Sequence, residues 1–383
     1  MKIGDPTYHG AEVVLPAEVI DSISIHVMQF DQYQSSLASC CLVNRSWYAG
    51  FIAGLYAYPI ITQRNFEYFA RTLSSPVTKK TKVGLEHLVK RLDLSSIAYE
   101  SSKSLTARLL GRVKNSLEFF ASPAITFSLT SLAPLSKCYN LHHLDLSADG
   151  YQLGLGKILA TVSHLEQLST LKLPTDAFAV QPEVASLMWP PNLRFVQLTD
   201  RLPNSSKNWD DVLRSLPKTV TTLRIHGCLN YDSVARLKEC EPSDNRVSRL
   251  EIGVSRDEAY MPFDAITTAA FPALRYIAVP APSLIPPATA MLVEPIIKHD
   301  GIEVLELTPI RDVGPPVKWE FDDFNTIIHS FTSLYKITIA EKNVRLDAGQ
   351  QLQLTELLDS RLRTDSVSQR RARPGFLIWS GAL

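Results

Sequence analysis

The sequence has few cysteines and no arrangement of them that suggests a disulfide framework or a metal site. Only five occur among 383 residues; Cys40 and Cys41 are adjacent, and Cys138, Cys228 and Cys240 are isolated. A disulfide-stabilised secreted domain needs paired cysteines at higher density, and a structural zinc site needs pairs at short spacing. We therefore expect reduced thiols, most of them buried.

Long apolar runs are absent as well. No segment approaches the roughly 20 consecutive apolar residues that a transmembrane helix needs. The N-terminal segment MKIGDPTYHGAEVV has no apolar core of the kind that marks a signal peptide. These absences predict a soluble intracellular protein, cytoplasmic or nuclear, with no membrane as a partner.

The chain also has no net charge, because 39 lysines and arginines balance 39 aspartates and glutamates. A neutral chain has no overall field that would attract it to nucleic acid or to an acidic membrane surface. Any charged partner has to be recognised by a local group of residues.

Motifs of catalytic and nucleotide-binding sites are missing too. The nine histidines include no HExxH pair, and the sequence has no GxSxG and no Walker motif. Gly154 and Gly156 lack the third glycine of a dinucleotide-binding loop. We therefore expect no metal site, no cofactor and no enzymatic activity of the chain's own.

Near its N-terminus the chain does contain two short amphipathic helical segments. The first is LPAEVIDSISIHV, in which Pro16 suits a first helical turn and Glu18 complements the helix dipole. The second is LASCCLVNRSW, residues 37–47, after the polar break DQYQSS. A helical unit of this size buries little apolar surface by itself. The apolar surface that stays exposed would need a partner or the next domain to cover it.

These two segments resemble the F-box, a helical module whose pattern starts with LPxE and continues with a leucine-led helix of the form LxxCxLVxxxW. The resemblance covers residues 12–58 and departs from the pattern at HVMQFDQYQSS. Helices that merely cap a repeat array are the alternative. The resemblance implies docking on Skp1, the adaptor of cullin-RING ubiquitin ligases. The residues that would carry this docking are Leu15, Pro16, Glu18, Ile20, Leu37, Leu42, Val43 and Trp47.

Residues 59–84 are interpreted as a helical connector. Tyr58, Phe66 and Phe69 recur at near-helical spacing, and the segment ends at Ser-Ser-Pro. The polar residues 78–82 are the expected boundary with the next domain.

A motif of the form apolar-x-x-apolar-x-apolar recurs between residues 89 and 339. From Leu144 onward its middle positions are spaced by 27, 25, 27, 27, 27, 28 and 32 residues. The gap of 52 residues between Leu92 and Leu144 equals two periods, which predicts a degenerate repeat centred on Leu117, with Lys114 in an apolar position. The middle positions are Leu92, Leu144, Leu171, Val196, Leu223, Leu250, Ile277, Leu305 and Ile337.

Helix-like stretches follow several of these strands, at residues 155–164, 209–216, 233–240, 263–270, 288–299 and 324–331. A strand and a helix in each period resemble the leucine-rich repeat. Each such unit covers its apolar side only by stacking on its neighbours. We expect an α/β protein: an N-terminal all-α F-box module, then a leucine-rich-repeat solenoid of about ten repeats over residues 85–345.

Alternate residues of the strands would face outward on the concave side of such a solenoid. Arginine and tyrosine are enriched at binding hot spots, and long insertions in solenoids often lie at binding edges. A solvated face, or a structural role for the insertion at residues 308–323, is the alternative. The candidate partner-binding residues are Lys172, Arg224, Arg249 and Tyr276 on the strands, and Trp319 and Phe321 in the insertion.

Residues 346–383 are expected to form a cap helix over 346–362, a basic tail and a closing apolar segment. Arg370, Arg371 and Arg373 belong either to a disordered linker or to a nuclear-localisation patch, and so short a basic run does not separate the two.

The family resemblance implies the substrate-recognition subunit of a Skp1-cullin-F-box ubiquitin ligase, which binds Skp1, and through it a cullin-RING ligase, together with a protein substrate. A scaffold or assembly factor that does not send its partner for degradation stays open. A nucleic-acid binder that uses Lys172, Arg224 and Arg249 is the third hypothesis; its binding would depend steeply on salt, and the neutral net charge argues against it.

Overall fold

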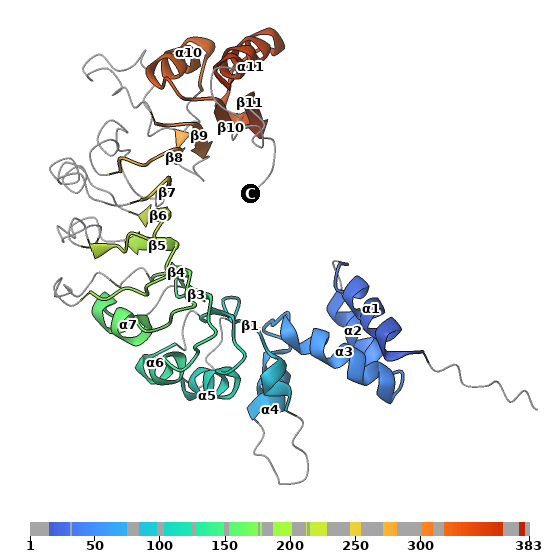
Figure 1. Ribbon diagram of the computed structural model, residues 1–383. Coiled ribbons are helices and arrows are strands. Elements are labelled where there is room, and N and C mark those ends of the chain that lie inside the picture. Colours follow the sequence, from blue (N-terminus) through green and yellow to red (C-terminus); the bar gives the residue numbers. More distant parts are fainter. Residues whose placement is uncertain are drawn as a thin grey trace, which may run out of the picture.

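The computed structural model describes residues 15–30, 33–74, 84–97, 103–123, 127–148, 153–174, 177, 187–200, 212, 215–227, 246–253, 271–281, 301–308, 318–362 and 375–379. These residues form an arc in which a long sheet lines the inner side, helices cover the outer side, and a group of N-terminal helices stands off one end (Figure 1). None of the helices in these ranges is long and apolar enough to cross a membrane.

Three helices form the N-terminal group: α1 (Ala17–Val27), α2 (Tyr33–Cys41) and α3 (Arg45–Ala57). Asn44 caps α3, because its side-chain oxygen accepts a hydrogen bond from the backbone N–H of Trp47 at 3.0 Å. The three helices share a small core made of Ile20, Leu37 and Phe51. This core is separate from the main one, so the apolar residues that the group does bury pack largely among its own helices.

Helices α1 and α3 approach each other closely at two glycines. A Cβ atom added at Gly50 would lie 2.6 Å from Cγ2 of Ile20, and one added at Gly54 would lie 3.1 Å from Sδ of Met28. Ile20 is buried and β-branched, so it has little freedom to move away. The absence of side chains at these two positions therefore lets α3 pack against α1.

Helix α4 (Phe66–Ser74) and the 3-10 turn η1 (Leu85–Leu88) join this group to the sheet. Phe66 and Leu73 pack into the main core. The backbone N–H of Lys90 donates to the carbonyl oxygen of Ala57 at 3.0 Å, which ties the end of α3 to the start of the sheet. The boundary predicted at residues 78–82 lies outside the described residues.

The strands pair in parallel and in sequence order. Together they confirm the long parallel sheet that the repeat motif predicts. The strands are β1 (Arg91–Asp93), β2 (Phe119–Ala121), β3 (His143–Asp145), β4 (Thr170–Lys172), β5 (Phe195–Asp200), β6 (Thr222–Gly227), β7 (Arg249–Gly253), β8 (Tyr276–Pro280), β9 (Val304–Thr308), β10 (Lys336–Ala340) and β11 (Gly375–Trp379).

Strand β2 lies later in the chain than the motif predicts. The sequence predicts a repeat centred on Leu117, whereas Phe120 is the residue that pairs with Leu92 and Leu144. Leu117 and Phe120 are both fully buried. Leu117 therefore takes the first apolar position, Phe120 takes the middle one, and Lys114 falls outside the motif.

The main core runs without interruption along the sheet. In β3, for example, Leu144 and the flanking Leu141 and Leu146 are all fully buried. Burial of a leucine side chain contributes about 1.5–3 kcal/mol. Most of this burial comes from neighbouring strands and helices, so each unit depends on the units beside it.

Several helices cover the outer side of the arc (Figure 1). Helices occur where the sequence predicts them at residues 155–164, 324–331 and 346–362, whereas α5 and α6 are not predicted by the repeat pattern. The other predicted helices lie wholly or largely outside the described residues, so ten complete repeats stay a prediction. The observed helices are α5 (Lys103–Val113), α6 (Leu129–Leu135), α7 (Leu155–Val162), α10 (Phe321–Ser330) and α11 (Ala348–Leu362).

Candidate interaction surfaces

The first candidate surface lies on the N-terminal helices. Leu42 and Val43, which link α2 to α3, expose 86% and 59% of their surface. Pro16 and Glu18 are exposed at the start of α1, next to a partly buried Leu15. The link between α2 and α3 therefore offers two adjacent aliphatic side chains to a partner.

Three other residues of this predicted set lie elsewhere. Ile20 and Leu37 are only 2% and 0% exposed and form the core of the helical group, so they are corrected from contact residues to core residues. Trp47 is partly buried, and its ring stacks on Phe51 with centroids 5.2 Å apart and planes within 4°. Ile20 and Leu37 therefore stabilise the packing of the helices that carry the exposed residues.

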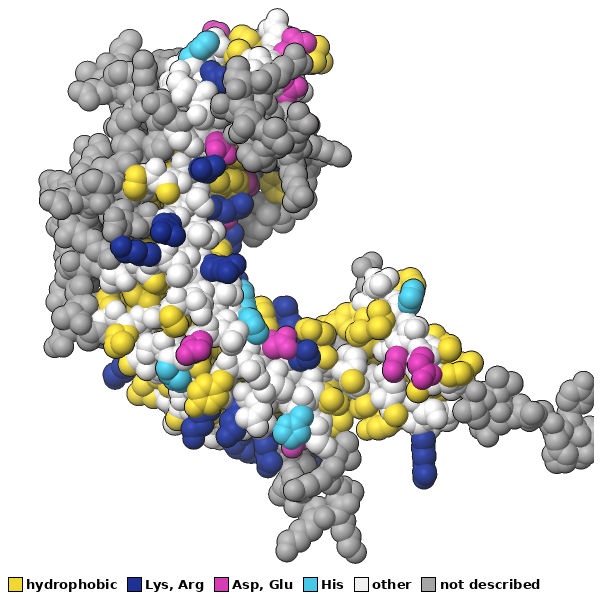
Figure 2. Space-filling model, viewed as in Figure 1, with side chains coloured by type: hydrophobic (Ala, Val, Ile, Leu, Met, Phe, Trp, Pro, Cys, Tyr) yellow, Lys and Arg dark blue, Asp and Glu magenta, His cyan; other side chains and the backbone are white. Residues whose placement is uncertain are grey.

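The second candidate surface is the concave face of the sheet, where Lys172, Arg224, Arg249 and Tyr276 lie on β4, β6, β7 and β8. Charged and polar side chains follow the inner side of the arc (Figure 2). The structure thus brings the four strand candidates onto one face.

Each cationic candidate on this face contacts a carboxylate of its own or a neighbouring strand. Nζ of Lys172 lies 2.7 Å from a carboxylate oxygen of Asp145. Nε of Arg249 lies 2.6 Å from one oxygen of Glu251, and Arg224 contacts the other oxygen. The hydroxyl group of Tyr276 donates to Glu306. The three cationic candidates therefore share two carboxylates, so their charges are largely paired and one positive charge is left in excess.

Two carboxylates of this face, those of Asp145 and Glu251, are held in the ionised form in the folded chain. Burial alone would raise the pKa of the Asp145 and Glu251 carboxyls, but hydrogen bonds and the charges of their partners outweigh it, and both pKa values lie below the usual range. Burial and the hydrogen bond to Glu306 raise the pKa of Tyr276, which keeps its phenol protonated as the donor.

The carboxylates that pair with these cations, Asp145 and Glu251, are not among the residues predicted from the sequence. The repeat period nevertheless indicates them. Asp145 and Lys172 are 27 residues apart, and so are Arg224 and Glu251. In a parallel sheet whose repeat is 27 residues long, such pairs occupy the same register on adjacent strands. Opposite charges one period apart therefore predict ion pairs across the sheet.

Stacked π systems form a second feature of the concave face. The guanidinium carbon of Arg91 lies 3.9 Å from the ring centroid of Phe119, and Phe119 stacks on His143 with centroids 4.3 Å apart. Arg249 stacks in the same way on Tyr276, at 3.7 Å. These flat groups give the face apolar contact area between its ion pairs.

His143 sits among these groups in a neutral form. Burial, together with the positive charge of Lys172, lowers the pKa of His143 to about 4, although Asp145 acts in the opposite direction. Its Nε2 atom is buried and has no hydrogen-bond partner within the described ranges. The ring therefore acts as a stacking surface with one unsatisfied nitrogen.

The substitution His143→Phe is expected to raise the melting temperature by roughly 2–4 °C at pH 5 and by less at pH 8. Phenylalanine keeps the stack on Phe119 and removes the buried nitrogen. Between about pH 6.5 and 4 the unfolded chain binds a proton at His143 that the folded chain does not, so stability falls as the pH falls through this window. Circular dichroism melts at the two pH values measure the gain, and an equal gain at both would contradict the assignment.

The two candidate residues of the insertion, Trp319 and Phe321, lie beside the main core. Trp319 is fully buried against Phe324, and Phe321 begins α10 and packs partly buried against the main core. The prediction of Trp319 as a partner-binding residue is therefore corrected, because its side chain is fully buried, whereas the role of the partly buried Phe321 stays a prediction.

No group of three or more His, Cys, Asp or Glu side chains in the described part of the chain is arranged to hold a metal ion. Arg370, Arg371 and Arg373 of the predicted basic tail lie outside the described residues.

No family model matches this sequence. Two curated fungal proteins are similar to it. Protein pof5 of Schizosaccharomyces pombe is 28% identical over 216 residues, which cover 56% of this chain and 58% of that protein. F-box protein YDR306C of Saccharomyces cerevisiae is 30% identical over 190 residues, which cover 49% of this chain and 37% of that protein. The similarity confirms the resemblance to F-box proteins, over a part of each relative's length.

Among solved structures, the crystal structure of the Rad7 and Elc1 complex in yeast is similar in 88% of this chain and 96% of that chain, with a TM-score of 0.42 and 14% sequence identity.

Proposed function

We propose that this chain is the substrate-recognition subunit of a Skp1-cullin-F-box ubiquitin ligase, in which the N-terminal helices bind Skp1 and the concave face binds a protein substrate. The observation that carries the proposal is the exposure of Leu42 and Val43 in a segment that matches the second half of the F-box pattern. Similarity to a fungal F-box protein supports it.

The exposed aliphatic pair has a physical reason to seek a partner. Burying a leucine or valine side chain contributes about 1.5–3 kcal/mol, and Leu42 obtains almost none of this within the chain because 86% of its surface is exposed. Protein interfaces gain most of their affinity from a few such anchors in well-packed pockets. The pair therefore fits the role of an anchor for an adaptor.

The concave face supports the second half of the proposal by its charge pairing. Because Lys172, Arg224 and Arg249 already contact two carboxylates, a partner gains less from them than from three free cations. Apolar contact with the edges of the stacked rings of Phe119 and Tyr276, together with hydrogen bonds to the polar groups beside them, would provide the contact. Binding of this kind depends weakly on salt, unlike the binding of nucleic acid.

In this role the chain contributes position and no chemistry of its own. Holding a substrate beside a ubiquitin-charged enzyme converts an encounter between free molecules into a reaction within one assembly. What the chain supplies is therefore the distance and orientation between its two binding surfaces.

The experiment that tests this function compares the proteins captured by the wild-type chain with those captured by the double variant Arg249→Ala, Tyr276→Ala. Skp1 is expected with both, whereas a substrate is expected only with the wild type. A substrate that accumulates after depletion of this chain supports a receptor. A captured protein whose abundance falls after depletion would contradict the receptor and support the non-degradative scaffold.

A further inference from the structure

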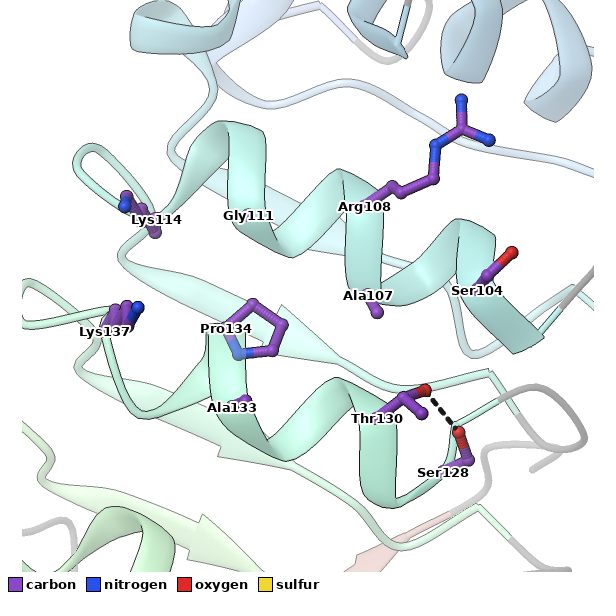
Figure 3. Close-up of a pocket in the computed structure, with 10 residues that line it drawn as sticks. All are labelled: Ser104, Ala107, Arg108, Gly111, Lys114, Ser128, Thr130, Ala133, Pro134 and Lys137. Atoms are coloured by element: carbon purple, nitrogen blue, oxygen red, sulfur yellow. Dashed lines mark hydrogen bonds between the residues drawn. The ribbon is translucent and has the colours of Figure 1, made fainter.

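An open groove of about 650 Å³ runs between α5 and α6 on the outer side of the arc (Figure 3). Its floor consists of small side chains, namely Ala107, Gly111, Ala133 and Pro134. The groove lies on the side of the sheet opposite the concave face, so a ligand there would not compete with one on the strands.

The groove is bordered by positive charges without negative partners. Arg108, Lys114 and Lys137 line it, and none of them forms an ion pair with another described residue. Helices α5, α6 and α7 contain no aspartate or glutamate at all. Figure 2 shows Lys and Arg side chains gathered over this outer surface. The contrast with the paired charges of the concave face is notable because the chain as a whole is neutral.

The two lysines lie at the same end of the groove, beyond the C-terminal ends of α5 and α6, whereas Arg108 extends from α5 away from α6 (Figure 3). A lysine at a helix C-terminus complements the helix dipole, so Lys114 and Lys137 each stabilise the end of their own helix. The helix C-terminus carries only about half a negative charge, so it does not neutralise the lysine beside it. The charges of Lys114 and Lys137 therefore stay available to a ligand.

Gly111 keeps the floor of the groove open. A Cβ atom added there would meet no atom within 4 Å. The φ angle of Gly111 is not positive, since Gly375 is the one glycine among the described residues with a positive φ. The fold therefore does not require a glycine at position 111. A glycine in an exposed helical turn admits close approach of another chain.

We propose that the groove between α5 and α6 binds an acidic peptide segment of a protein partner, with carboxylates at Lys114 and Lys137 and an apolar side chain on the floor. The apolar floor favours a peptide over a nucleic acid, because the lining offers no aromatic ring on which a base could stack. This inference stands independently of the proposed ubiquitin-ligase function.

The test uses a fluorescein-labelled peptide of about nine residues with the repeat Glu-Leu-Glu and the full chain, measured by fluorescence anisotropy. Saturable binding is expected, and the double variant Lys114→Glu, Lys137→Glu should weaken it by at least about tenfold. A peptide with the repeat Lys-Leu-Lys should bind the double variant better than the wild type. The matched control Lys157→Glu on α7 should change the wild-type affinity for the acidic peptide less than about twofold.

A second pair of variants tests the floor. Gly111→Leu fills the groove and should weaken binding at least about tenfold, whereas Gly156→Leu on α7, where an added Cβ also meets no atom, should leave it unchanged. The absence of saturable binding at about 1 mM chain would overturn the proposal. So would a single-stranded oligonucleotide of similar length that binds more tightly than the peptide and is insensitive to Gly111→Leu.

Discussion

Replacing Trp319 with alanine is expected to lower the free energy of unfolding of the C-terminal end of the sheet by about 3–5 kcal/mol. Trp319 is fully buried, and its ring lies 5.5 Å from that of Phe324. Its backbone N–H donates to Asn343 and its carbonyl oxygen accepts from Arg345, both at 2.9 Å. The truncation would leave a cavity beside α10 while the backbone pairing remains. Urea denaturation followed by far-ultraviolet circular dichroism measures the loss.

The matched control is Trp319→Phe. The indole Nε1 of Trp319 is buried and finds no hydrogen-bond partner among the residues that the structure describes. Phenylalanine keeps an aromatic ring against Phe324 and removes this unsatisfied donor, whose burial costs about 1–3 kcal/mol. The loss of unfolding free energy in Trp319→Phe should therefore be less than half of the loss in Trp319→Ala. An unchanged denaturation midpoint for Trp319→Ala, together with loss of a captured partner, would restore the binding role that the sequence predicts.

The repeat motif predicted the sheet well because its period is a direct consequence of strand stacking. Leu144, Leu171 and Leu223 are spaced by whole repeats, and each occupies the buried middle position of its strand. The predicted position of β2 was wrong, because its middle position is occupied by Phe120 and not by a leucine. The apolar residues around Leu117 fit the motif in two registers.

Contact residues of the N-terminal helices were harder to predict, because an amphipathic pattern shows that a face is apolar without showing which neighbour covers it. Ile20 and Leu37 have the same pattern as a docking face, yet α3 covers Ile20 at Gly50. The spacing of Gly50 and Gly54, one helical turn apart, is the sequence signal for this close packing.

The end of the chain shows a different limit. The sequence predicts a closing apolar segment over residues 376–379, and these residues belong to strand β11 beside β10. A short apolar run is compatible with several structures when periodicity is the only guide. The pairing of Ile337 with Phe376 depends on the preceding sheet edge, which the local sequence does not contain.

The double variant Leu42→Asp, Val43→Asp is expected to weaken the binding of Skp1 by at least about a hundredfold. It would place two carboxylates in the apolar contact that we propose for the α2–α3 link, where burial of a charge without a partner is costly. Because both side chains are mostly exposed in the free chain, the variant should keep its helical content and melting temperature.

Phe30→Asp serves as the matched control. Phe30 is also a large apolar side chain of this helical group, 68% exposed. It follows α1 and precedes α2, so roughly one helix length separates it from Pro16 at the start of α1 and from Leu42 at the end of α2. A loss of Skp1 binding that is equal for both variants would mean that the contact covers the whole helical group.

The most direct test of the central claim is an isothermal titration of purified Skp1 with the purified full chain and with the variant Leu42→Asp, Val43→Asp. The claim predicts saturation at one Skp1 for each wild-type chain, with a Kd on the order of 1 μM or lower, and no measurable binding by the variant. Absence of binding by the wild type, or equal affinity of the wild type and the variant, would contradict it.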